Sequence, residues 1–206
     1  MSETTAGSPT GMASADSSRR TWLIATAAMG GVGAAAVAVP FVSSIQPSER
    51  ARAAGAAVEV DISALLPGEK RVVEWRGKPV WIMRRTPEQL ASLKGYDAQL
   101  ADPNSDRNAY PTPEYAKNTH RSIKPELLVA VGICTHLGCS PSDKFAEGAQ
   151  PSLPDDWKGG FLCACHGSTF DLAGRVFKNK PAPDNLEVPP HVYLSDTTLL
   201  VGEDKA

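Results

Sequence analysis

Residues 134–139 read CTHLGC and residues 163–168 read CACHGS, and these two boxes carry more information than any other part of the chain. They contain all 4 cysteines and half of the 4 histidines, namely His136 and His166. Each box places a thiol and an imidazole close together, next to a glycine that permits a tight turn. Thiolates combined with imidazoles are typical ligands of zinc and of iron–sulfur centres. The boxes therefore predict one metal centre shared between two loops.

Three alternatives remain open from the residue types and their spacing. Four cysteines in an exported protein commonly form two disulfides, but that arrangement would leave both box histidines without a role. Four thiolates are the usual ligand set of a [2Fe–2S] cluster and would leave the same histidines idle. Zinc bound by two cysteines and two histidines is also chemically possible.

The pair of boxes resembles those of the Rieske iron–sulfur proteins of quinol–cytochrome c reductases. A Rieske centre is a [2Fe–2S] cluster in which two histidines replace two cysteines on one of the irons. Transferred to this sequence, the resemblance implies that Cys134 and Cys163 ligate one iron and that His136 and His166 ligate the other.

Four further residues of this stretch receive a role from the resemblance. Cys139 and Cys165 match the disulfide that ties the two loops together in this family. Ser168 is expected to donate a hydrogen bond to a bridging sulfur, and Leu137 to shield the cluster and pack against the quinol pocket. At position 170 many family members have tyrosine, and the phenylalanine found here predicts a lower reduction potential.

Composition and turn signals predict the fold class. The chain has 206 residues with 17 prolines and 17 glycines, which favours a mainly β structure over a helical bundle. We expect a Rieske-type antiparallel β domain over residues 58–206, with a cluster-binding subdomain inserted at about 129–184. A formal net charge of −2 gives no electrostatic case for nucleic acid.

The N-terminal region predicts an exported, membrane-anchored protein. Ser18–Leu23 reads SRRTWL and resembles a twin-arginine export signal. The uncharged stretch 22–42 would span about 31 Å as a helix, which matches one hydrocarbon core. We therefore expect a disordered cytoplasmic segment over 1–21, a transmembrane helix over 22–42 that stays attached, and a flexible hinge over 43–57. A cleaved signal peptide is the alternative.

Several elements are expected within the β domain. Alternating apolar residues predict strands over 58–62, 70–75 and 80–83, and Thr86 followed by proline predicts a short helix through Leu93. The polar residues 97–119 predict a long surface excursion. Residues 180–183 resemble the proline loop that covers the cluster in the family, and residues 140–160 are expected to form a polar insert between the boxes.

The resemblance also implies a function. It predicts a high-potential [2Fe–2S] electron carrier of the respiratory cytochrome bc1 complex, which receives an electron from ubiquinol while His166 receives a proton. The electron then passes to cytochrome c1. The expected partners are the cytochrome b and cytochrome c1 subunits of a dimeric complex in the bacterial inner membrane, with the β domain on the periplasmic side. The chain would be a subunit of an enzyme and not a complete enzyme. The alternative function is the small subunit of a periplasmic oxidase such as arsenite oxidase.

Overall fold

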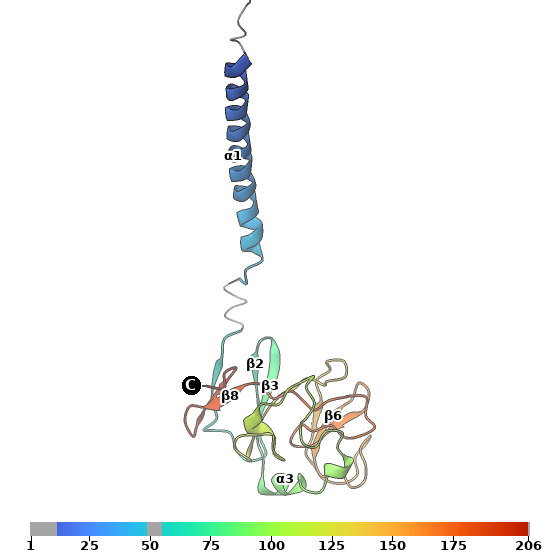
Figure 1. Cartoon of the computed structure of the whole chain (residues 1–206). Helices are drawn as coiled ribbons and strands as arrows, with labels where there is room; N and C mark the ends of the chain where they lie inside the picture. The colour runs from blue at the N-terminus through green and yellow to red at the C-terminus, as the bar shows by residue number, and fades with distance from the viewer. Residues whose placement is uncertain (1–11, 49–54, 206) are drawn as a thin grey trace, which may run out of the picture. The chain divides into compact units, whose positions relative to one another are not determined.

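The computed structural model describes residues 12–48 and 55–205. The chain divides into two compact units, with the boundary between Ala51 and Arg52. The first unit is dominated by one long helix, and the second, called the head below, contains all the strands (Figure 1).

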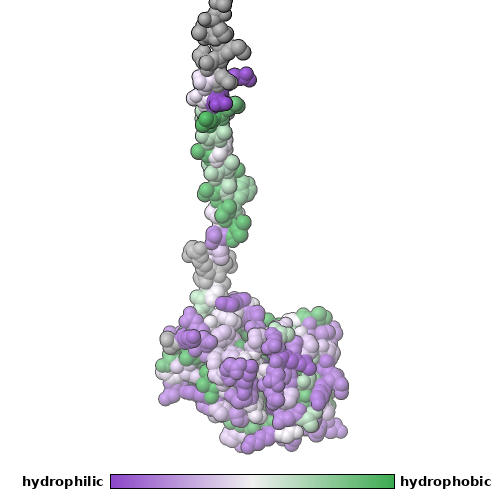
Figure 2. Space-filling view, in the orientation of Figure 1, coloured by the Kyte–Doolittle hydropathy of each residue, from purple (hydrophilic) through white to green (hydrophobic). Residues whose placement is uncertain are grey.

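Helix α1 (Met12–Ser44) is long and apolar enough to cross a membrane over Ser17–Ser44. Figure 2 shows apolar side chains along its surface, and Trp22, Val32 and Phe41 are each more than half exposed. Such a surface is stable in a bilayer, because the helix satisfies its own backbone hydrogen bonds and presents apolar side chains to the lipid.

The bounds of α1 differ from the predicted N-terminal boundaries. The helix begins at Met12, within the segment that was expected to be disordered, and it extends to Ser44, into the predicted hinge. Alanine and methionine have high helix propensity, and extending an existing helix fixes few residues for each hydrogen bond gained. Residues 1–11 of the predicted disordered segment and residues 49–54 of the predicted hinge lie outside the described residues.

The described part of the head contains three antiparallel sheets of three strands each. The first has the order β1 (Val58–Asp61), β9 (Thr198–Val201), β8 (His191–Tyr193). The second has the order β2 (Lys70–Trp75), β3 (Lys78–Arg84), β4 (Leu127–Val131). The third has the order β5 (Ser142–Lys144), β6 (Gly160–Cys163), β7 (Ser168–Phe170). The predicted antiparallel β fold is confirmed, and β5 is a strand within the segment predicted as a polar insert.

Local sequence explains the connections. The turn between β2 and β3 consists of Arg76 and Gly77, both with positive φ, which matches the twist of a two-residue hairpin. Helix α3 (Pro87–Ser92) begins with a capping box, in which the side chains of Thr86 and Gln89 each accept a hydrogen bond from the other's backbone N–H. Strand β4 is buried along its whole length, as its sequence LLVAV requires.

The predicted surface excursion is only partly at the surface. It contains two short 3-10 helices, η1 (Asp97–Gln99) and η2 (Glu114–Ala116). Five of its side chains are buried, namely Leu100, Asp102, Ser105, Thr112 and Ala116. Polar residues in a proline-punctuated segment usually face solvent, so their burial requires hydrogen-bond partners elsewhere in the fold.

The third sheet packs on the second through a mainly aromatic contact. The rings of Trp81 on β3 and Phe161 on β6 lie 4.7 Å apart, and the ammonium of Lys70 on β2 lies 4.2 Å from the Trp81 ring centre. Gly132 follows β4, and a methyl group added there would lie 2.1 Å from the Trp81 indole. A glycine at 132 therefore lets the chain pass over Trp81 on its way to the first box.

Candidate metal centre

Both boxes fold as the same kind of turn. The carbonyl of Cys134 accepts a hydrogen bond from the N–H of Gly138 at 3.0 Å, and the carbonyl of Cys163 accepts one from Gly167 at 2.9 Å. Both glycines have positive φ, +83° and +76°, a backbone conformation that favours glycine. The repeated Cys-x-x-x-Gly spacing thus gives two matching loops, each with its first cysteine at the base.

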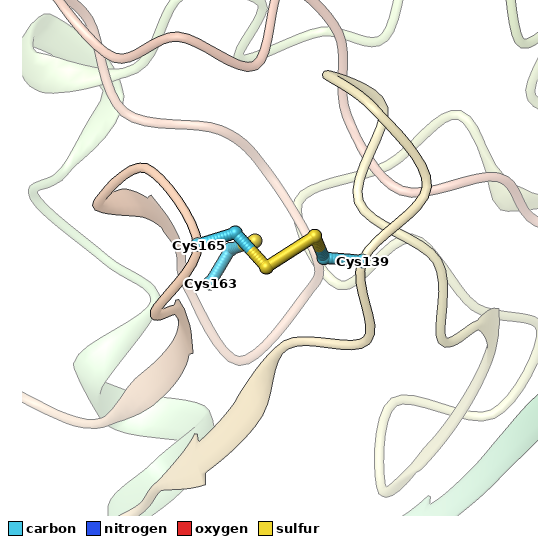
Figure 3. Close-up of side chains that lie close together, drawn as sticks. All are labelled: Cys139, Cys163 and Cys165. Atoms are coloured by element: carbon cyan, nitrogen blue, oxygen red, sulfur yellow. A yellow bond between two sulfur atoms is a disulfide. The ribbon is translucent and has the colours of Figure 1, made fainter.

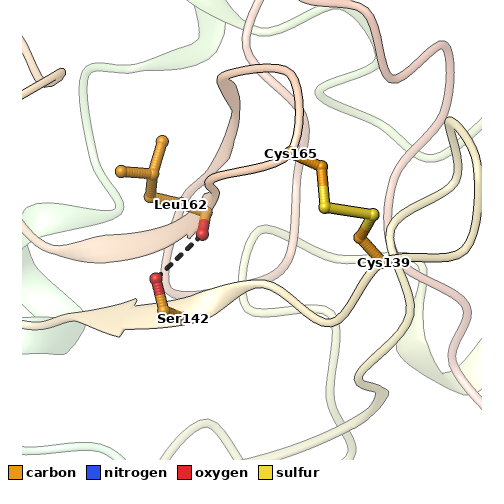
Figure 4. The surroundings of a disulfide bond; sticks show 4 residues. All are labelled: Cys139, Ser142, Leu162 and Cys165. Carbon is orange, nitrogen blue, oxygen red and sulfur yellow. Dashed lines mark hydrogen bonds between the residues drawn. A yellow bond between two sulfur atoms is a disulfide. The ribbon is translucent and has the colours of Figure 1, made fainter.

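A disulfide joins the two loops. The sulfur atoms of Cys139 and Cys165 are bonded at 2.25 Å, which is the pairing that the resemblance implied. Close to the disulfide, the Ser142 hydroxyl donates a hydrogen bond to the Leu162 carbonyl across β5 and β6 (Figure 4). The loops are therefore tied together both covalently and through the third sheet.

The disulfide determines which thiols are available. The sulfur atom of Cys163 lies beside it, within 4.8 Å of both disulfide sulfurs (Figure 3). Disulfide sulfurs are not thiolates, so these three atoms do not form a ligand set. Cys134 and Cys163 are the only free cysteines, and both are buried. Neither two disulfides nor four thiolate ligands are compatible with this arrangement.

The two box histidines lie together. The ring centres of His136 and His166 are 4.7 Å apart and the ring planes are perpendicular. His136 is half-buried, whereas His166 is exposed. Leu137, the residue after His136, is 71% exposed. The structure thus groups two imidazoles at an open end of the loops and two thiols at the closed end.

The unpaired ring nitrogen and the buried thiols of this site fit a bound metal centre. The Nδ1 atom of His136 is buried and makes no hydrogen bond within the described residues. Burial raises the pKa of the Cys134 thiol, and contact with Cys163 adds to the rise, while the backbone N–H of His136 opposes it. Buried thiols in this setting become thiolates when a metal supplies the compensating charge. One thiol and one imidazole from each of the two loops match the donor set of a Rieske cluster.

A loop over residues 180–184, called the covering loop below, is bonded to both boxes. The N–H of Ala182 donates to the Ser168 hydroxyl at 2.9 Å, and the Thr135 hydroxyl donates to the Asp184 carbonyl at 2.6 Å. Because the Ser168 oxygen accepts from Ala182, its own proton remains free to donate, and Cys134 is one of its contacts. Thr135 was not singled out from the sequence, since its partner lies 49 residues further along the chain.

Phe170 belongs to the core that surrounds the buried cysteines. It is fully buried, pairs with Phe161 across β6 and β7, and shares one apolar cluster with Cys134 and Cys163. The site of the expected tyrosine hydroxyl is therefore inside the protein and close to the region of the free thiols.

Comparisons with known proteins find two families that match this chain. Residues 114–190 match the family described as "Rieske [2Fe-2S] domain", and residues 10–48 match "Ubiquitinol-cytochrome C reductase Fe-S subunit TAT signal". The latter is compatible with the predicted twin-arginine signal. Among solved structures, a chain of "Hyperthermophilic respiratory Complex III" is 28% identical with a TM-score of 0.44, and the match covers 85% of this chain and 97% of that one.

Two curated relatives cover nearly the whole chain. The "Ubiquinol-cytochrome c reductase iron-sulfur subunit" of Allochromatium vinosum is 59% identical over 91% of this chain and 89% of its own length. The protein of the same description from Rhodospirillum rubrum is 40% identical over 97% and 98%, respectively. With this identity and coverage, and with both loops of the site in place, the chain belongs to the family of ubiquinol–cytochrome c reductase iron–sulfur subunits and carries a Rieske-type [2Fe–2S] cluster.

Proposed function

We propose that this subunit carries electrons from ubiquinol to cytochrome c1, with Cys134 and Cys163 ligating one iron and His136 and His166 the other. The observation that carries this proposal is the pairing of two free, buried cysteines with two adjacent imidazoles on disulfide-linked loops. When bound, the cluster supplies a one-electron acceptor whose potential is high because two neutral imidazoles replace two thiolates.

His166 is the residue that meets the quinol. Its ring is exposed, so a quinol hydroxyl can donate a hydrogen bond to the outer ring nitrogen. Histidine is the side chain that most readily gains and loses a proton near neutral pH. His166 therefore takes the proton at the point where the electron leaves the quinol, which couples the two transfers in one residue.

Two residues of the boxes support the role of His166. Leu137 offers an exposed apolar side chain on the neighbouring box, suited to pack against the wall of a quinol pocket in a partner subunit. Ser168, fully buried, donates its hydroxyl proton toward sulfur and so stabilises the more negative, reduced form. Both roles depend on the rigid turns described above.

The apolar helix and the disulfide support a location for the two units of the chain. We place α1 in the bacterial inner membrane and the head on the periplasmic side, where the disulfide persists because that compartment is oxidising. The partners are the cytochrome b and cytochrome c1 subunits of a dimeric complex. Family membership removes the reason for the alternative assignment to a periplasmic oxidase.

Pulsed EPR of the reduced full-length protein in detergent tests the ligand set. Protein labelled with 15N only at histidine should show strong nitrogen coupling from two imidazoles. His166→Cys should remove one coupling or the cluster, whereas His120→Asn, a control outside the boxes, should leave the spectrum unchanged. A paramagnetic cluster without histidine coupling would overturn the assignment, and so would a His166→Cys spectrum identical to that of the unaltered protein.

A further inference from the structure

The contact between the excursion, residues 97–119, and the covering loop has no role in the function proposed above. Residues 102–107 of the excursion, called the strap below, approach the covering loop from a distant part of the sequence. The guanidinium of Arg107 donates to the Pro183 carbonyl and lies 3.7 Å from the Asp184 carboxylate. The strap thus contacts the covering loop at residues next to those that bind the two cluster boxes.

The strap is rigid by its own hydrogen bonds. The buried Asp102 carboxylate accepts from the backbone N–H of Asp106 at 2.9 Å and of Arg107 at 3.2 Å. Ser105 has positive φ (+59°), which closes the turn between them. A carboxylate that bonds backbone N–H groups four and five residues ahead fixes the turn in one conformation.

A second contact lies deeper, at Asn185, directly after the covering loop. Its side-chain amide donates to the Asp102 carbonyl at 2.9 Å and to the Ser105 hydroxyl at 3.2 Å. Its side-chain oxygen accepts from the N–H of Val176 at 2.9 Å. Asn185 therefore joins the strap to the segment that follows the second cluster box.

Arg121 stabilises this junction through hydrogen bonds. It is fully buried, and its guanidinium donates to five oxygen atoms. These are the hydroxyls of Ser105 (2.8 Å) and Thr112 (3.0 Å) and the carbonyls of Ala173 (3.1 Å), Gly174 (3.3 Å) and Leu186 (2.8 Å). Burial lowers the pKa of Arg121 to about 10, so it stays charged at neutral pH. A buried cation whose donors are all used holds its acceptors in one geometry.

We infer that the strap, through Arg107, Ser105 and Asn185, positions the covering loop against both cluster boxes and thereby sets the midpoint potential of the cluster. These are positioning residues, since none of them belongs to a box. Two residues of the loop pass the constraint on, because Ala182 bonds Ser168 and the Asp184 carbonyl bonds Thr135. The inference rests on the ligand set proposed above.

The direction of the effect follows from Ser168. The Ala182 N–H fixes the Ser168 oxygen, so the hydroxyl proton points elsewhere, toward sulfur. A loosened covering loop weakens that orientation, and weaker hydrogen bonds to the cluster sulfurs disfavour the reduced form. Loss of a strap contact should therefore lower the potential.

Two matched pairs of variants separate positioning from general stability. Ser105→Ala and Ser122→Ala each remove a buried serine hydroxyl that accepts from a buried arginine at 2.8 Å. The partner of Ser122 is Arg85, whose guanidinium donates to acceptors at residues 120, 122, 125 and 172, outside the covering loop. Arg107→Gln removes the positive charge of a strap side chain that is 44% exposed. Its control, Lys117→Gln, removes a positive charge from the same excursion, and the ion-pair partner of Lys117 is Glu114 and not a residue of the covering loop.

The test uses full-length protein in detergent, with midpoint potentials from EPR-monitored titration and thermal midpoints as a parallel readout. Arg107→Gln and Ser105→Ala should each lower the equilibrium constant for reduction at least threefold, about 28 mV for a one-electron couple. Lys117→Gln and Ser122→Ala should keep the unaltered potential, although Ser122→Ala lowers the thermal midpoint. Hydrogen exchange in residues 180–186 should accelerate only in the two strap variants.

Unaltered potentials in both strap variants would overturn the inference, and equal shifts in variants and controls would overturn it as well. If Ser105→Ala fails to retain the cluster, the exposed Arg107→Gln alone decides. A different outcome concerns the proposed function: if the unaltered protein shows no histidine-coupled cluster, the ligand assignment fails, whatever the variants do.

Discussion

Replacing Cys139 and Cys165 together by alanine should lower the free energy of unfolding by about 3.5 kcal/mol. The disulfide closes a loop of 26 residues. In the chain-entropy description, opening such a loop in the unfolded state releases about 12 cal/mol/K, which gives about 3.5 kcal/mol at 25 °C. Cys165 is exposed and Cys139 half-buried, so the alanine substitutions remove little packing and the loop term dominates.

Pairing of β5 with β6 does not compensate for this loss. Those strands, and the hydrogen bond between Ser142 and Leu162, bring the ends of the same loop together only in the folded head. In the unfolded chain nothing but the disulfide restricts the 26 residues. The stabilisation therefore acts through the unfolded state, and the folded structures of the two proteins should be alike.

Urea unfolding of the full-length protein in detergent measures the effect. Trp75, Trp81 and Trp157 are each at most 4% exposed, so their fluorescence reports loss of the head structure, whereas Trp22 on α1 is 72% exposed and contributes a background. With a slope of about 1–3 kcal/mol/M, the midpoint should fall by about 1–3.5 M. A thiol reductant should lower the unaltered protein toward the variant and leave the variant unchanged.

A loss below about 1 kcal/mol at equal cluster content would refute the reasoning. It would mean that the unfolded chain already keeps the two boxes close together without a covalent bond. A variant that loses stability but still responds to the reductant would refute it in another way, since no second disulfide exists to be opened.

Three further changes have outcomes that the structure specifies. Phe170→Tyr places a hydroxyl in a fully buried site among the cysteines. A hydrogen bond from this hydroxyl to a ligand sulfur, worth about 1 kcal/mol, should raise the midpoint potential by about 40 mV. An unchanged potential would show that residue 170 does not face that sulfur. Burial lowers the pKa of His191 below its usual 6.5, so the unfolded state binds the proton first as the pH falls. The free energy of unfolding should therefore decrease below about pH 6.5, by at most about 1.4 kcal/mol per pH unit. His191→Asn should reduce this slope. Gly132→Ala places a methyl 2.1 Å from the Trp81 ring and should lower stability by about 1–3 kcal/mol in thermal unfolding; a thermal midpoint equal to that of the unaltered protein would contradict the close approach.

The site was predictable because its chemistry is concentrated in rare residue types at short spacing. Spacing alone could not choose between two disulfides, four thiolates and mixed ligands, since the pairing of Cys139 with Cys165 depends on how two loops 26 residues apart meet in space. The strands β1 and β2 were predicted from alternating apolar residues. Strand β5, with the sequence SDK, gives no such signal, because it forms by pairing with β6.

The excursion shows what local sequence cannot reveal. Ser105 and Thr112 have the composition of a surface loop, and their burial follows from bonds to Arg121, 16 and 9 residues away. Arg121 in turn binds carbonyls more than 50 residues further on. Nothing in a sequence window marks an arginine as buried, so this network appears only once the fold is known.

The segment between β5 and β6 offers a place to extend the protein outside both cluster boxes. The disulfide and the strand pairing fix both of its ends, and residues 151 and 152 in the turn between them are exposed. Doubling the length of such a loop costs only about 0.6 kcal/mol of closure entropy. An affinity tag or a fluorescent label inserted there would mark the head without changing the length of either cluster box.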